Sequence, residues 1–318
     1  MDTRKPIINF VLDFDDTVCC GNCQDPVFNY NLQRLNAKYE PLGFPIRCAD
    51  DYWKTLPAGD REITYLQAFM ADIHDGTLLN ELNEPIRSDD LTFFGRDIQL
   101  IDRIGAFIIE TKRQWEGVAD IRFHIVSVGI RELISGCKIA SLFDSIHANA
   151  FDENITRIQK FLNGFSKIAA VIEIIKGSDF NCKMRHESYD GDYKNTICVG
   201  DSSGDIPMMC YLRKKGATTI GLYANNSEES YSEAMKLLGD RVENILPRRY
   251  DADAPIRVIV NKAISKMLNP ARCSFPSELQ HMVKKRKTGD ASAILLVSKH
   301  IALCDQCMPG FSTTFIEP

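Results

Sequence analysis

The chain has 318 residues, of which 44% are hydrophobic and 25% are charged. This ordinary globular composition excludes disordered, collagen-like and low-complexity proteins, and the length predicts about two compact domains. Lysine and arginine number 38 against 43 aspartate and glutamate, a net charge of −5. Because no overall basic field favours nucleic acid, a small molecule is the expected ligand.

The cysteines and the apolar runs indicate where the protein works. The 11 cysteines are an odd number scattered through the chain, so they cannot all pair within it, and a reducing cytoplasm is the expected location. Asp13, Asp15 and Asp16 interrupt the N-terminal apolar run that begins at residue 7, which argues against a signal peptide. The later run 291–303 is broken by polar residues and is too short to cross a bilayer. We therefore expect no membrane segment.

Four short apolar runs rich in β-branched residues predict buried strands of a parallel sheet. They are residues 7–12, 121–126, 196–199 and 218–222. Apolar residues recur at helical spacing in 167–176 and 227–238. Strands that alternate with helices predict an α/β fold with a doubly wound parallel sheet.

Between residues 17 and 120 the apolar residues recur at helical rather than strand spacing. This pattern predicts a helical insertion in the α/β fold. Its three apolar stripes are Leu32, Leu35 and Tyr39; Ile63, Leu66, Phe69 and Ile73; and Ile101, Ile104, Ile108 and Trp115.

The C-terminal part differs from the rest of the chain in charge. From Arg248 onward the chain has a net charge of +5, whereas the residues before it have −10. The run 284–287 supplies most of the contrast. Such a run can bind an anionic surface or act as an import signal, but a solvated helix face is the plainer interpretation.

Carboxylates follow the first predicted strand directly, as Asp13, Asp15 and Asp16. Side chains alternate along an extended chain, so Asp13 and Asp15 can project toward the same crevice. Crowded like charges cost free energy unless a cation or a proton relieves them, and Mg²⁺ takes carboxylate and backbone oxygens as ligands. Open α/β sheets bind ligands at the carboxyl ends of their strands, so we expect a magnesium site there.

Three further elements predict a phosphate site at the same edge. Residues 200–205 carry Asp201 at a strand end and Asp205 four residues later, where both can face one cation. Ser127 ends another predicted strand beside exposed backbone N–H groups, and Lys167 begins a helix. Each alone is more typical of a helix cap or a surface residue, but together they indicate one magnesium–phosphate site.

These motifs resemble those of the haloacid dehalogenase-like (HAD) superfamily over residues 1 to about 247. The turn Ser127-Val128-Gly129 is similar to the Ser-Gly-Gly turn of its phosphoserine phosphatase branch. The resemblance implies a catalytic core at 1–18 and 119–247 and a helical C1-type cap at 19–118, and it leaves 248–318 as a basic helical extension of unknown role. The motifs that carry it are Asp13-x-Asp15-x-Thr17, Ser127, Lys167 and Gly200-Asp201-x-x-x-Asp205.

The resemblance implies magnesium-dependent hydrolysis of a small phosphomonoester. Asp13 would attack phosphorus to form an aspartyl-phosphate, and Asp15 would act as general acid and then base. Asp15 also argues against the dehalogenases of the family, which need no such proton donor. The remaining implied contacts are Mg²⁺ with Asp13, the Asp15 carbonyl oxygen, Asp201 and Asp205, and phosphate with Ser127, Val128 and Lys167.

Alternatives remain open at this stage. A phosphotransferase or mutase shares every motif, and a regulatory module could use the basic C-terminal part to bind an anionic partner. The unusual separation between Lys167 and Asp201 keeps Lys160, Lys176 and Lys183 as alternative cationic residues.

Two other sequence features have both a functional and a plain interpretation. The Cys20–Cys23 and Cys304–Cys307 pairs could bind zinc, although zinc modules usually bring their pairs close in sequence. Aromatic and basic residues of the insertion could line a lid over the substrate, although core packing is the commoner role for aromatic residues on helices. These are Tyr52, Trp53, Arg61, Phe69, Phe93 and Phe94.

Overall fold

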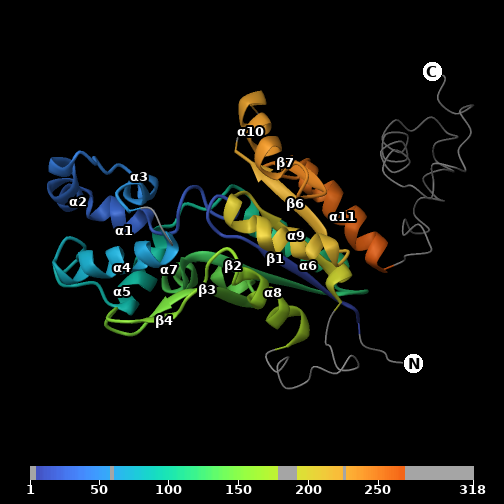
Figure 1. The fold of residues 1–318 in the computed structure, drawn as a ribbon. Helices are drawn as coiled ribbons and strands as arrows, with labels where there is room; N and C mark the ends of the chain where they lie inside the picture. The colour runs from blue at the N-terminus through green and yellow to red at the C-terminus, as the bar shows by residue number, and fades with distance from the viewer. Residues whose placement is uncertain (1–4, 58–60, 178–191, 225–226, 269–318) are drawn as a thin grey trace, which may run out of the picture. The chain divides into compact units, whose positions relative to one another are not determined.

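The computed structural model describes residues 5–57, 61–177, 192–224 and 227–268 (Figure 1). These residues form an α/β fold around a seven-stranded sheet in the order β4-β3-β2-β1-β5-β6-β7, in which only β4 is antiparallel to its neighbour. The predicted α/β fold with a parallel sheet is therefore confirmed. The strands are β1 Ile7–Leu12, β2 Asp120–Ile130, β3 Ser145–Phe151, β4 Ile158–Lys160, β5 Thr196–Gly200, β6 Thr218–Tyr223 and β7 Asn244–Pro247.

The chain divides into two compact units. The first runs to Pro255 and contains the whole sheet, and the second begins at Ile256. Helix α11, Pro255–Leu268, begins at the last residue of the first unit, and its remainder is the part of the second unit that the structure describes. None of the described helices combines the length and the apolarity needed to span a bilayer.

The strand order reverses beside β1. The chain passes outward from β1 through β2 and β3 and then returns to place β5 on the other side of β1. Pairing continues past the strand ends, because the Asp13 N–H donates to the Val199 carbonyl oxygen at 2.9 Å. The loops that follow β1 and β5 consequently emerge side by side, at the point where doubly wound sheets bind their ligands.

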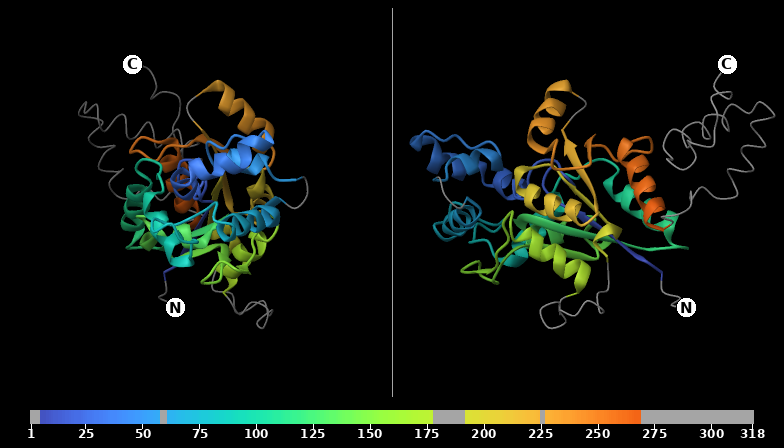
Figure 2. Two further views of the ribbon diagram at one scale, coloured as in Figure 1. Left: turned by 90° about the vertical axis from the view of Figure 1, so that its left-hand side faces the viewer. Right: turned by 45° about the vertical axis from the view of Figure 1, so that its right-hand side comes forward.

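Alternation along β1 places apolar side chains on both faces of the sheet. Phe10 stacks on Phe123 of β2 at 4.3 Å, and Phe107 of helix α6, Ile104–Trp115, packs edge-on against both rings. Val11 points to the opposite face, into a buried cluster with helices α8, Lys167–Lys176, and α9, Ile206–Lys214. Helices therefore cover both faces of the sheet (Figure 2).

The helices expected between residues 17 and 120 are present. The helices before α6 share an aromatic core, in which Phe28, Tyr52 and Phe69 are buried and pack ring against ring, whereas α6, which carries the third predicted stripe, packs on the sheet. The buried carboxylate of Asp72 accepts hydrogen bonds from the Tyr52 hydroxyl at 2.6 Å, from the Tyr39 hydroxyl and from Lys38. The helices before α6 are α1 Asp25–Tyr30, α2 Leu32–Tyr39, α3 Ala49–Lys54, α4 Arg61–His74 and α5 Ser88–Phe94.

Two glycines form a close contact between this insertion and the helix that follows β2. Helix α7, Arg131–Gly136, follows β2 and meets α5 where Gly95 and Gly136 lie against each other. A β-carbon on Gly136 would overlap the carbonyl oxygen of Thr92, and one on Gly95 would overlap that of Leu133. Only glycine permits this close approach of the two backbones.

The second strand departs from its predicted end. The apolar run 121–126 predicts a strand that stops at Ser127, but β2 continues to Ile130 because it keeps pairing with β3 as far as Asn149. The pairing register shifts between Val126 and Ile130. Ser127 therefore lies within an irregular strand, four residues before helix α7 begins.

Candidate active site

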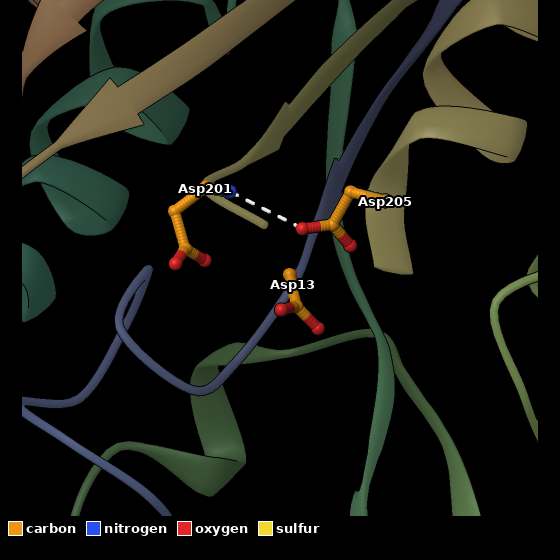
Figure 3. A group of neighbouring side chains, drawn as sticks. All are labelled: Asp13, Asp201 and Asp205. Atoms are coloured by element: carbon orange, nitrogen blue, oxygen red, sulfur yellow. Dashed lines mark hydrogen bonds between the residues drawn. The ribbon is translucent and has the colours of Figure 1, made fainter. Parts of the chain in front are cut away.

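Three carboxylates converge at the reversal point of the sheet (Figure 3). Asp13 follows β1, Asp201 follows β5, and Asp205 precedes α9. One carboxylate oxygen from each of these residues lies within 4.8 Å of the other two. Asp13 and Asp205 are buried and Asp201 is partly exposed. Residues far apart in the sequence thus form one acidic cluster.

Lys167 inserts its ammonium group into this cluster. Its Nζ donates to Asp13 Oδ1 at 2.8 Å and to Asp205 Oδ1 at 2.7 Å, and only 1% of the side chain is exposed. Burial lowers the pKa of Lys167, but the adjacent carboxylates outweigh burial and raise it, so the lysine is charged. Of the alternative lysines, Lys160 lies beside a ring nitrogen of His147, Lys176 lies over the Tyr193 ring, and Lys183 is outside the described residues.

The cluster has more negative than positive charge. Burial and the charge of Asp205 raise the pKa of Asp13 to about 6, although Lys167 opposes the change. Burial, Asp205 and Asp13 together raise the pKa of Asp201. One lysine cannot neutralise three carboxylates, and a hard divalent cation would relieve the remainder. The oxygen donors and their spacing therefore fit Mg²⁺.

Asp205 organises the loop after β5. Its Oδ2 accepts the backbone N–H groups of Asp201 at 3.2 Å and Ser202 at 3.1 Å, and also the Ser202 hydroxyl. A β-carbon on Gly200 would lie 2.6 Å from this oxygen, so glycine is required there. Both carboxylate oxygens of Asp205 thus have protein donors, and the loop that carries Asp201 is fixed by them.

Asp15 lies apart from the three clustered carboxylates, against two cysteines. The Cys23 N–H donates to Asp15 Oδ1 at 2.7 Å, and the thiols of Cys19 and Cys23 lie 3.7 and 3.9 Å from the carboxylate oxygens. Exclusion of water and the charge of Asp13 raise the pKa of Asp15 to about 7, against the effect of the Cys23 N–H. A carboxyl group with this pKa can both donate and accept a proton near neutral pH.

The Ser127–Gly129 segment runs beside Asp15. Ser127 is buried, and its Oγ accepts the Gly129 N–H at 2.9 Å. A β-carbon on Gly129 would lie 3.4 Å from Asp15 Oδ2. The side chain of Asn149 in β3 also holds this segment, because it donates a hydrogen bond to the Val128 carbonyl oxygen. Sequence reasoning missed Asn149 because nothing in its local sequence indicates this contact.

Residues that follow β7 hold the loop after β1. The Tyr250 hydroxyl donates to the Thr17 carbonyl oxygen at 2.8 Å, and the Thr17 hydroxyl donates to Asp201 Oδ1 at 3.1 Å. Arg248 pairs with the Asp16 carboxylate and also donates to the Asp16 carbonyl oxygen. Asp16 has a φ of +50°, which is uncommon for a residue other than glycine. Arg248 and Tyr250 were not singled out by any sequence motif.

Several predicted features fall wholly or partly beyond the described residues. Cys304, Cys307, the basic run 284–287 and the apolar run 291–303 all lie outside them. Both cysteines of the first pair are described: Cys23 is buried against Asp15, whereas Cys20 is exposed. Of the possible lid residues, Tyr52 and Phe69 pack in the core of the insertion, and Phe93 is exposed.

Comparisons with known proteins give distant similarities. No family model matches the chain. An uncharacterized protein of Borreliella burgdorferi is 24% identical over 256 residues, which cover 72% of this chain and 88% of that protein. A HAD family hydrolase from Salmonella enterica serovar Typhi is 12% identical with a TM-score of 0.46, and the match covers 77% of this chain and 69% of the hydrolase. A phosphoserine phosphatase in its apo form is 15% identical with a TM-score of 0.46, and the match covers 80% of this chain and 98% of the phosphatase.

Proposed function

We propose that the protein is a magnesium-dependent phosphomonoester hydrolase of the HAD type, which acts on a small phosphorylated metabolite through an aspartyl-phosphate intermediate. The observation that carries this proposal is the buried cluster of Asp13, Asp201 and Asp205 around Lys167, beside Asp15. Phosphoryl transfer requires a positioned nucleophile and positive charge around the phosphoryl oxygens. The cluster offers a carboxylate nucleophile and a buried cation within hydrogen-bonding distance of each other.

In the proposed reaction Asp13 attacks phosphorus and Lys167 binds a phosphoryl oxygen. Asp15 donates a proton to the departing alcohol oxygen and later accepts one from the water that hydrolyses the intermediate. Ser127 and the Val128 N–H bind further phosphoryl oxygens. Phosphate then leaves, and Asp13 returns to its free form.

Asp13, the Asp15 carbonyl oxygen and Asp201 would hold Mg²⁺, which supplies positive charge for the phosphoryl oxygens. Asp205 completes the acidic set, and its existing donors suit it to orient Lys167 and the Asp201 loop. This assignment gives each of the four predicted acids a role at one site.

We also propose a division of labour within the chain. The core at 1–18 and 119–247 performs the chemistry, and the C1-type cap at 19–118 closes over the substrate. Helix α6 packs on the sheet, so α1 to α5 would supply the lid. Beyond 247, Arg248 and Tyr250 support the loop after β1. A reducing cytoplasm remains the proposed location, supported by seven free cysteines among the described residues.

The test is phosphate release from an aryl phosphate by the full chain with Mg²⁺. Asp13→Asn should lower kcat at least about 1,000-fold because it removes the nucleophile, and the circular dichroism spectrum should stay unchanged. The matched control is Asp120→Asn, because Asp120 begins β2, at the end of the strand away from the acidic cluster. It should retain wild-type turnover. Chelation of Mg²⁺ should abolish activity and its return should restore it.

Two results would contradict the proposal. Substantial turnover by Asp13→Asn would exclude Asp13 as the nucleophile. A wild-type protein that transfers the phosphoryl group to an added alcohol and releases no inorganic phosphate would be a phosphotransferase. Product analysis by phosphorus NMR distinguishes hydrolysis from transfer.

A further inference from the structure

Four buried polar side-chain atoms among the described residues have no hydrogen-bond partner. Thr196 begins β5, at the end of the strand away from the acidic cluster, and Glu132 is paired through its other oxygen with Arg131. The remaining two are Gln24 Oε1 and the Tyr65 hydroxyl, and both belong to the insertion. A buried polar group without a partner is unfavourable, so such groups call for an explanation, and a ligand is one.

The Tyr65 ring is held rigidly. It stacks on Trp53 at 4.3 Å with an interplanar angle of 9°, and it packs against Tyr52 and Phe69. Phe69, one turn further along α4, stacks at 6.1 Å on Phe151 at the carboxyl end of β3. Helix α4 therefore contacts the sheet at the edge that carries the acidic cluster. The hydroxyl of Tyr65 cannot turn to another partner without disturbing this ring stack.

Cys23 connects this part of the insertion to the proposed proton donor, Asp15. After burial, the strongest electrostatic influences on the Tyr65 hydroxyl come from Cys23 and Asp15. Cys23 donates its backbone N–H to Asp15, and its thiol lies 3.9 Å from the same carboxylate. Gln24 is the next residue in the chain, and only 2% of it is exposed. Asp15 is thus bonded to the residue that precedes Gln24, and its charge acts on the Tyr65 hydroxyl.

We propose that the Tyr65 hydroxyl and the Gln24 side-chain carbonyl bind the alcohol portion of the substrate, and that this alcohol carries a further hydroxyl or ammonium group. This inference rests on the proposed function, in which Asp15 protonates the alcohol oxygen. Gln24 Oε1 only accepts hydrogen bonds, so its ligand must donate one, whereas Tyr65 can donate or accept. An unsubstituted alkyl group would leave both protein atoms unpaired, and sites of this kind discriminate strongly.

Three matched substrates test the inference: ethyl phosphate, 2-hydroxyethyl phosphate and 2-aminoethyl phosphate. Wild type should hydrolyse one of the two substituted esters with a kcat/KM at least about tenfold above that for ethyl phosphate. Tyr65→Phe should reduce this preference about tenfold, because kcat/KM falls more for the preferred ester than for ethyl phosphate. Gln24→Met should act in the same direction.

Tyr52→Phe is the matched control, because the Tyr52 hydroxyl lies in the same aromatic core but is bonded to Asp72. It should lower the melting temperature and leave the substrate preference unchanged. Tyr65→Phe should keep or raise the melting temperature, since it removes a buried hydroxyl that has no partner. Stability and specificity thus move independently if Tyr65 binds substrate.

The outcomes separate this inference from the proposed function. No preference in wild type, or equal loss on all three esters by Tyr65→Phe, would overturn the inference while leaving the hydrolase intact. If wild type hydrolyses no ester, the proposed function fails. Calorimetric binding of the three esters to the magnesium-loaded Asp13→Asn variant then tests Tyr65 and Gln24 without turnover, and equal affinities would overturn their role.

Discussion

The buried histidine of β2 makes the stability of the fold depend on pH. His124 is 7% exposed; its Nε2 contacts Asn9 Oδ1 at 3.2 Å and its Nδ1 contacts the Ser145 hydroxyl at 2.8 Å. These contacts fit a neutral ring that donates to Asn9 and accepts from Ser145. Burial lowers the pKa of His124 from 6.5 to about 4. The unfolded chain therefore binds a proton at a pH where the folded chain does not.

Acidification from pH 7 to pH 5 should consequently lower the free energy of unfolding by about 2 kcal/mol through this histidine alone. His124→Gln keeps an amide donor for Asn9 and removes the titration, so its unfolding free energy should fall by about 2 kcal/mol less over the same interval. Urea unfolding of both proteins at the two pH values, without Mg²⁺, measures the difference.

The raised pKa values of Asp13 and Asp15 act in the opposite direction, because the folded chain binds protons there more readily than the unfolded chain. Both proteins share this effect, so it cancels in the comparison. Identical pH dependence in wild type and His124→Gln would refute the assignment of a neutral, buried histidine.

Two further predictions concern the loop after β1 and the glycine contact. Tyr250→Phe removes the hydrogen-bond donor to the Thr17 carbonyl oxygen and should raise the Mg²⁺ concentration for half-maximal activity severalfold, because the Thr17 hydroxyl also donates to Asp201. The control is Tyr231→Phe at an exposed tyrosine. An unchanged Mg²⁺ dependence in Tyr250→Phe would contradict the role of Tyr250 in positioning the loop after β1. Gly136→Ala should destabilise the fold by about 1–3 kcal/mol or more in urea unfolding, since its β-carbon overlaps the Thr92 carbonyl, whereas Gly117→Ala, with open space around it, should be nearly neutral.

Continuous apolar runs made part of the sheet predictable. Residues 7–12 and 167–176 form the expected strand and helix with the expected bounds. Strand β3 was missed because His147 and Asn149 interrupt its apolar pattern. Both are buried: Asn149 bonds the Val128 carbonyl oxygen and the Leu162 N–H, and His147 contacts Ser145 of its own strand. Strands β4 and β7 have three and four residues, too few for a periodic signal.

The acids of the site could be proposed because they follow strand ends directly, and strand order alone then brings Asp13 beside Asp201. The supporting contacts had no such signal. Arg248 lies 232 residues from its partner Asp16, and neither the charge nor the spacing of Arg248 distinguishes it from other basic residues near it. Side-chain contacts between distant segments depend on packing, which a single sequence does not specify.

Hydrogen-bond saturation distinguishes the two sides of the site. On the sheet side Lys167 bonds two carboxylates, both oxygens of Asp205 have donors, and Ser127 is bonded within its own turn. On the insertion side the Tyr65 hydroxyl and Gln24 Oε1 are buried without a hydrogen-bond partner. Under the proposed function, the saturated network would bind the phosphoryl group, which every substrate shares, and the unpaired atoms would bind the alcohol, which differs between substrates. The same proposal accounts for what the sequence indicates: a shared phosphoryl group requires motifs with fixed spacing, whereas a particular alcohol requires only complementary atoms.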